Sequence, residues 1–193
     1  MQRELILASS SKYRRELLSR LALKFRCEAP HVDETPNKTE NPLDTCIRLA
    51  RNKCLEVAAK HPEAVVIGSD QVADVEGQAV SKPGNHEKAR AQLRSMSGKT
   101  ILFHTAVCLH CSELGQTVEL VVPTEVEFRN LTASEIERYL LAEEPYDCAG
   151  SAKSEGLGIS LLNRIESRDP TALIGLPLIE LSKALRQFEL VLP

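Results

Sequence analysis

Short runs of consecutive apolar residues alternate along the chain with stretches in which apolar residues recur every three or four positions. The runs at residues 5–8 and 64–67 are each four residues long, which is typical of strands buried on both faces. Gly68 follows the second run and predicts that this strand ends at Ile67. Strands that alternate with helices predict an α/β fold with a mixed, twisted sheet and flanking helices.

Helical spacing and capping residues predict five helices. Asn41 before Pro42 is a favourable helix start, and Thr132 with Glu135 forms a capping-box pattern. The first expected helix starts at residue 12, and the last starts at residue 177. The three between them cover about 42–60, 85–96 and 132–142. The remaining apolar stretches predict a hairpin over 72–80 that turns near Gly77, two long antiparallel strands over 100–111 and 118–128, and a strand over about 159–165.

The composition is that of an ordinary soluble protein, and we expect a single domain over residues 1–193. Hydrophobic residues make up 42% and charged residues 26% of the chain. A net charge of -3 argues against a nucleic-acid polymer as partner. The first apolar run is too short for a signal peptide, and no segment approaches the ~18 apolar residues of a spanning helix. These features predict a cytoplasmic protein that does not bind membranes.

The six cysteines show no framework spacing and are expected to be reduced and mostly buried. Cys108 and Cys111 match a Cys-x-x-Cys pattern inside an alternating, strand-like run. Because no second ligand pair accompanies them, we expect no zinc site there.

Asp70 and Gln71 follow the buried run at residues 64–67. Ligands of open α/β sheets bind outside the carboxyl ends of strands, so Asp70 is placed to meet a metal ion or a reacting water. The alternative is an ordinary strand exit, where Ser, Asp and Gly are common.

Three serines, the last of them Ser11, precede a helix whose first turn contains Arg14 and Arg15. Basic residues at this end oppose the helix dipole, whereas hydroxyls and free backbone N–H groups bind phosphate. The pattern favours an anion site, and the alternative is that both arginines are simply solvated.

Three more charged residues are candidates for the same site. Lys53 borders the apolar face of its helix, so it either extends to solvent or neutralises an anion. Lys82 ends the predicted hairpin and returns toward Asp70. Glu34 follows Asp33 in a turn-like segment, and such adjacent acids either hold a divalent cation or merely solvate a loop.

Seven short motifs in a fixed order resemble the Maf family. They are Leu-Ala-Ser-Ser-Ser before Arg14 and Arg15, Val-Asp-Glu34-Thr-Pro, Arg48-Leu-Ala before Lys53, Gly-Ser-Asp70-Gln71, Lys82-Pro83, Ser97-Gly98 and Gly175-Leu-Pro-Leu. The resemblance implies a homodimer whose fold, with two lobes around a cleft, resembles that of the inosine-triphosphate pyrophosphatases. It also implies hydrolysis of nucleoside triphosphates between the α- and β-phosphates with Mg2+, Mn2+ or Co2+.

The resemblance also implies roles for individual residues. Asp70, Lys53 and Lys82 would be catalytic, and Glu34 with Asp70 would hold the metal. The expected substrate-binding residues are Ser11, Tyr13, Arg14, Arg15, Gln71 and Glu155.

The branch of the family that this chain most resembles acts on 7-methyl-GTP. Tyr13, Gln71 and Glu155 stand where that branch sets its selectivity. One alternative is hydrolysis of dTTP and UTP, whose enzymes resemble Gly-Ala-Asp-Thr and Gln-Gly where this chain has Gly-Ser-Asp-Gln and Glu-Gly. The other is a non-enzymatic nucleotide-binding regulator of septum formation.

Overall fold

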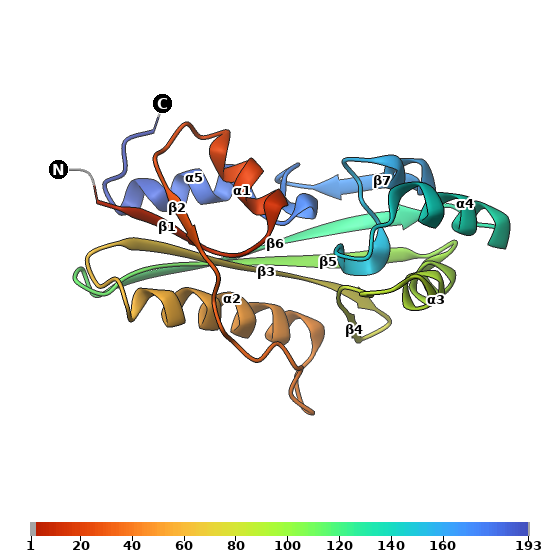
Figure 1. Ribbon diagram of the computed structural model, residues 1–193, viewed down its shortest axis with the longest axis horizontal. Helices are drawn as coiled ribbons and strands as arrows, with labels where there is room; N and C mark the ends of the chain where they lie inside the picture. The colour runs from red at the N-terminus through yellow and green to blue at the C-terminus, as the bar shows by residue number, and fades with distance from the viewer. Residues whose placement is uncertain (1–2, 193) are drawn as a thin grey trace.

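A seven-stranded mixed sheet runs the length of the molecule (Figure 1). The computed structural model describes residues 3–192. The strands are β1 (Leu5–Ala8), β2 (Arg26–Glu28), β3 (Val65–Val75), β4 (Gln78–Val80), β5 (Thr100–Cys111), β6 (Gln116–Phe128) and β7 (Leu162–Ser167). Their order is β2-β1-β3-β5-β6-β7, with β4 beside β3. β1 pairs in parallel with β2 and β3, and the other pairs are antiparallel, which confirms the predicted mixed sheet.

Five α-helices flank the sheet, as predicted. They are α1 (Lys12–Ser19), α2 (Pro42–Ala58), α3 (His86–Met96), α4 (Ala133–Glu143) and α5 (Leu178–Gln187), and short 3-10 helices cover Ala149–Ser151, Leu157–Leu161 and Ala172–Ile174. The expected caps are present: the side chain of Asn41 accepts from the amide of Asp44, and Thr132 and Glu135 form a reciprocal capping box. None of these helices is long and apolar enough to cross a membrane.

Hydrophobic side chains collect in two large clusters, one toward each end of the sheet. The cluster around Leu7, Ile67 and Leu185 joins the sheet to α1 and α5. The cluster around Leu93 and Phe103 joins it to α3 and α4. In Figure 1, α1 and α5 lie toward one end of the long strands and α3 and α4 lie toward the other. Helix α2 lies across the sheet from α1 and α5. This arrangement agrees with the expected two lobes.

The second buried strand does not end at Ile67, as the sequence predicted. β3 continues to Val75, and Asp70 lies in its middle, opposite Ala106 of β5. Gly68 is not a turn residue here: a Cβ at this position would lie 2.3 Å from the carbonyl oxygen of Ala50 in α2. The glycine lets the helix approach the strand closely, and a local pattern does not distinguish this role from a turn.

One edge of β3 is open at its centre. β1 pairs with β3 only as far as Gly68, and β4 pairs with it only from Ala73 onward. Between them, residues 69–72 have no strand partner on that side within the described part of the chain. Side chains from both faces of the sheet can therefore reach a common space at this edge.

The hairpin and the two long strands are confirmed, but the strand expected over 159–165 is shifted. Leu157–Leu161 forms a 3-10 helix, and β7 starts only at Leu162. The apolar side chain of Ile159 points outward and is 53% exposed, so it does not belong to a buried strand face. Gly158 also packs closely against the backbone of Lys153, which bends the chain before β7.

All six cysteines are free thiols. Cys108 packs in a small cluster with Cys54 of α2, whereas Cys111 lies in the cluster that contains Leu7. Their side chains lie on opposite faces of β5, so they do not form a ligand pair.

Candidate active site

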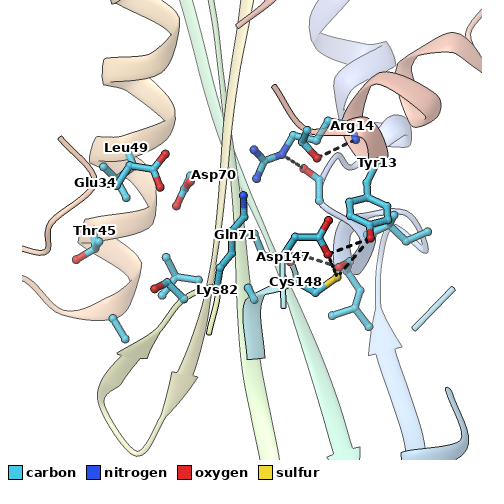
Figure 2. Close-up of a pocket in the computed structure, with 18 of the residues that line it drawn as sticks. Tyr13, Arg14, Glu34, Thr45, Leu49, Asp70, Gln71, Lys82, Asp147 and Cys148 are labelled. Atoms are coloured by element: carbon cyan, nitrogen blue, oxygen red, sulfur yellow. Dashed lines mark hydrogen bonds between the residues drawn. The ribbon is translucent and has the colours of Figure 1, made fainter. Parts of the chain in front are cut away.

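A cavity of about 310 Å³ lies at the open edge of β3 (Figure 2). It opens between the end of β1 and the start of the β3–β4 hairpin. Nine of the ten predicted site residues line it: Ser11, Tyr13, Arg14, Glu34, Lys53, Asp70, Gln71, Lys82 and Glu155. The structure therefore brings most of the predicted site residues together around one cavity.

Lys53 links the two candidate metal-binding carboxylates. Its Nζ lies 2.7 Å from Oδ1 of Asp70 and 2.6 Å from Oε1 of Glu34. The side chains of Lys53 and Asp70 are only 7% and 9% exposed, whereas that of Glu34 is 59% exposed. Two acids and one cation thus meet where the buried strand and helix reach the cavity, and we call these three residues the reaction end.

The close contact between α2 and β3 positions Lys53. The backbone nitrogen of Cys54 would lie 2.5 Å from a Cβ at Gly68. Lys53 is the preceding residue of α2, and Asp70 lies two residues after Gly68 on the same face of β3. A larger residue than glycine would push the helix away and lengthen the Lys53–Asp70 ion pair.

The loop that carries Glu34 is held to α2 by an ion pair that the sequence did not reveal. Arg48 donates to both carboxylate oxygens of Glu40 and to the backbone carbonyl of Thr35. Burial acts to raise the pKa of Glu34, but the hydrogen bond and charge of Lys53 outweigh it and lower the pKa. Glu34 is therefore an ionised carboxylate with a fixed backbone.

The two carboxylates at the reaction end suit a divalent cation. Within the described residues, no three Asp, Glu, His or Cys side chains are grouped as a complete ligand set. Mg2+ commonly uses one or two carboxylates and completes its shell with substrate phosphates and water. Glu34 and Asp70 each keep a second oxygen beyond the one that faces Lys53, so the donor set fits a cation that is shared with a phosphate ligand.

Arg14 enters the cavity from α1, on the other side of Asp70. Ser11 caps this helix by accepting from the amide of Arg14. The Nε of Arg14 and the hydroxyl of Ser69 both donate to the carbonyl of Gly175. Figure 2 shows the guanidinium directed toward Asp70. Arg14 thus presents a positioned guanidinium to the cavity.

Arg15 is the one predicted site residue that the structure places elsewhere. It lines a separate groove between α1 and β2, with Phe25 and Cys27. Adjacent helix residues point about 100° apart, and in α1 this rotation brings Tyr13 and Arg14 to the cavity and Arg15 to the groove. The sequence left both arginines as candidates, and only Arg14 reaches the site.

Gln71 lines the cavity, but its amide nitrogen is engaged by the protein. It donates to the carbonyls of Ala172 and Leu173, at 2.9 and 2.8 Å, and lies 3.1 Å from the hydroxyl of Thr105. These bonds hold the 3-10 helix Ala172–Ile174 against the sheet. Only the amide oxygen of Gln71 is left to face a ligand.

The opposite end of the cavity contains Tyr13, Asp147, Cys148 and Glu155, which we call the base end. The Tyr13 hydroxyl donates to Oδ1 of Asp147 at 3.2 Å, and the sulfur of Cys148 lies 3.8 Å from the same hydroxyl. Burial raises the pKa of Tyr13 and raises that of Cys148 to about 12, so both groups are neutral at pH 7.

Sequence reasoning missed Asp147 and Cys148 as site residues. Asp147 lies 134 positions from Tyr13 in the chain, so no local pattern links them. The available signal was the small-residue loop that begins at Cys148, which is of the kind that allows close approach to a ligand. Figure 2 shows Asp147 and Cys148 beside Tyr13, across the cavity from Glu34.

Comparison with known proteins identifies the family. The model of the Maf family, described as Maf-like protein, matches residues 4–188. The chain belongs to the Maf family. Similar proteins include the 7-methyl-GTP pyrophosphatases of Cupriavidus pinatubonensis, 56% identical over 95% of this chain and 92% of the relative, and of Ralstonia nicotianae, 56% identical over 96% of each. The 7-methyl-GTP pyrophosphatase of Bordetella pertussis is 54% identical over 97% of this chain and 93% of the relative.

Proposed function

We propose that this Maf protein hydrolyses 7-methyl-GTP to 7-methyl-GMP and pyrophosphate, and so removes a modified nucleotide from the cellular pool. The observation that carries the proposal is a single cavity with two different ends. Lys53, Asp70 and Glu34 meet at one end, and an aromatic ring and two carboxylates lie at the other. The names of the relatives at 54–56% identity support the same substrate.

At the reaction end, Asp70 accepts a proton from the water that attacks the α-phosphorus. The new bond joins the water oxygen to this phosphorus, while the bond to the oxygen that bridges the α- and β-phosphates breaks. The electron pair leaves with pyrophosphate. Lys53, Lys82 and Arg14 neutralise the phosphate charge and the charge that grows on the leaving group.

Glu34 and Asp70 would hold a divalent cation, Mg2+, Mn2+ or Co2+, through the carboxylate oxygens that face the cavity. When bound, the cation supplies further positive charge for the triphosphate. Lys53 lies between the two carboxylates and keeps them at one place before the cation and substrate arrive.

At the base end, Glu155 accepts hydrogen bonds from N1–H and the exocyclic amine of guanine. The ring of Tyr13 provides a face for the base, which N7 methylation makes cationic. A pyrimidine has no equivalent pair of adjacent donors, which argues against dTTP and UTP as substrates.

We also propose a cytoplasmic location and a homodimer. Free thiols at all six cysteines suit a reducing compartment. The dimer rests on the resemblance to the family, and sedimentation of the purified protein at two concentrations would measure its mass directly.

Pyrophosphate release tests the proposed reaction. The purified protein should be assayed with 7-methyl-GTP, GTP, dTTP and UTP, each with Mg2+, Mn2+ and Co2+. We expect the highest kcat/KM with 7-methyl-GTP and no turnover in a chelator. Equal rates with GTP, or a preference for a pyrimidine, would contradict the proposed substrate, and full activity in the chelator would contradict the metal.

A further inference from the structure

A cation already lies against the base end of the cavity. The ammonium of Lys12 lies 4.8 Å from the centre of the Tyr13 ring and 3.4 Å from Oδ2 of Asp147. The Tyr13 hydroxyl donates to the other carboxylate oxygen of Asp147. An aromatic face and a carboxylate that is fixed beside it are the two groups that stabilise an organic cation.

Lys12 approaches this pair of groups from outside the cavity. It lines the groove between α1 and β2, and its side chain is 72% exposed. Tyr13 and Asp147 line the cavity itself. The cavity side of both residues is therefore accessible to a ligand while Lys12 remains on the outer side.

Asp147 is a carboxylate in its ionised form. Burial acts to raise its pKa, but the charge of Lys12 and the hydrogen bonds from Lys12, Cys148 and Tyr13 outweigh burial and lower it. Asp147 and Glu155 both act on the nearby Cys148 thiol and raise its pKa. The two carboxylates therefore place their negative charge at the same end of the cavity.

We propose that Asp147 is a specificity-determining residue that recognises the positive charge of N7-methylated guanine, with the Tyr13 ring as its partner and Lys12 as a competing cation. This inference rests on the proposed function. The hydrogen bonds proposed for Glu155 do not distinguish the two nucleotides, because the N1–H and amine donors that Glu155 would accept are present in GTP as well. Methylation at N7 gives the base a positive charge that GTP lacks, and a carboxylate at this end of the cavity responds to that charge.

Two substitutions with opposite expected effects test this assignment. Asp147→Asn keeps the shape and an acceptor for Tyr13 but removes the charge. Lys12→Gln removes the competing cation from an exposed position. The quantity to measure is the ratio of kcat/KM for 7-methyl-GTP to kcat/KM for GTP, together with the ratio of Kd for the products GMP and 7-methyl-GMP.

We expect Asp147→Asn to lower the ratio about two- to fivefold and Lys12→Gln to raise it by a similar factor, the size typical of half-exposed charge interactions. The wild-type ratio should fall as NaCl rises, and the ratio of Asp147→Asn should change less, because salt screens the charge. Glu166→Gln is the matched control: it neutralises an exposed acid on β7, outside the cavity, and should leave both rates unchanged.

The outcomes separate this inference from the proposed function. If wild-type protein does not prefer 7-methyl-GTP, both are wrong. If wild type prefers it and Asp147→Asn keeps the same ratio and salt dependence, only the role of Asp147 is wrong. A lower ratio in Lys12→Gln would also overturn the assignment, because a merely structural contact between Lys12 and Asp147 would be damaged by either substitution.

Discussion

The two ends of the cavity differ in how they are built. At the reaction end, Lys53 and Asp70 are almost fully buried and come from the interior of a helix and of a strand. At the base end, Asp147 is 51% exposed and comes from the loop after α4, where it contacts the first turn of α1. Lys53 and Asp70, which we propose act on the triphosphate, are fixed by the core, whereas Asp147, which we propose faces the base, is held by a few surface contacts.

Because the two ends are built from different elements, we expect the reaction and the choice of base to depend on different residues. Every nucleoside triphosphate presents the same phosphates, so Asp70 and Lys53 meet the same chemistry whatever the base. A change at Glu155 or Asp147 alters a loop and leaves the packing of α2 on β3 intact. We expect substitutions at the reaction end to affect all substrates and substitutions at the base end to affect the ratio between substrates.

The largest expected effect is at Asp70. Asp70→Asn should lower kcat for every nucleotide by roughly 100- to 10,000-fold, because an amide cannot accept the proton of the attacking water. The folded structure should persist, since the amide preserves shape. Pyrophosphate release and circular dichroism measure the two effects.

Asp74→Asn is the control for Asp70→Asn. Asp74 lies on the same face of β3, near His104 and outside the cavity. Its substitution should leave turnover unchanged. Near-normal turnover in Asp70→Asn would exclude Asp70 as the proton acceptor.

Substitution of Lys53 and of Lys82 should lower kcat/KM to a similar extent but should affect the stability of the protein differently. Lys53→Met and Lys82→Met should each remove about 2 to 4 kcal/mol of transition-state stabilisation, seen in kcat/KM for all substrates. Lys53→Met should also lower Tm, because it leaves the buried Asp70 without its ion-pair partner. Lys82 is exposed, so Lys82→Met should keep the wild-type Tm. Equal Tm values would mean that Lys53 does not stabilise the buried carboxylate.

Glu155→Gln should act on the choice of base alone. The amide can accept only one of the two guanine donors, and its own NH2 meets the other donor unfavourably. We expect kcat/KM for both guanine nucleotides to fall on the order of tenfold, as for the loss of a hydrogen bond to a charged group. Turnover of UTP should not fall. An equal loss for UTP would show that Glu155 acts at the reaction end instead.

Most of the fold could be predicted because its signals are local. The caps of α2 and α4 are set by Asn41 and Thr132, which act on residues within one turn. Gly68 misled the prediction because glycine marks both turns and close helix contacts. Which of these applies depends on Ala50, eighteen positions earlier in the chain.

The reaction end could be predicted more fully than the base end. The spacing of α2 places Lys53 at the border of its apolar face, and Asp70 follows a buried apolar run, although the strand was wrongly predicted to end before Asp70. The choice between Arg14 and Arg15 depends on the carbonyl of Gly175, which lies 161 positions from Arg14. Asp147 is likewise placed by a contact between distant segments, and such contacts cannot be derived from one sequence pattern.

The smallest expected effect concerns the loop that carries Glu34, and it appears at low pH. The hydrogen bond from Arg48, the largest cause, and those from Asn37 lower the pKa of Glu40 from 4.5 to about 2. A carboxyl group whose pKa is lower in the folded state stabilises the fold above its unfolded pKa. That contribution is lost as the pH falls from about 4.5 toward about 2. Glu40→Gln should therefore lower the urea midpoint at pH 7, and its deficit against wild type should shrink as the pH falls through this range.

Glu135 has a similarly lowered pKa of about 2 in the capping box of α4, so wild-type protein loses stability in acid for more than one reason. The difference between Glu40→Gln and wild type isolates the contribution of Glu40. Glu76→Gln, which breaks the exposed ion pair with Lys99, should follow wild type across the range. Turnover of Glu40→Gln at pH 7 should change less than that of Lys53→Met, because Lys53 still holds Glu34 directly. A constant deficit from pH 7 to pH 2 would mean that Arg48 and Glu40 fix this loop by packing rather than by charge.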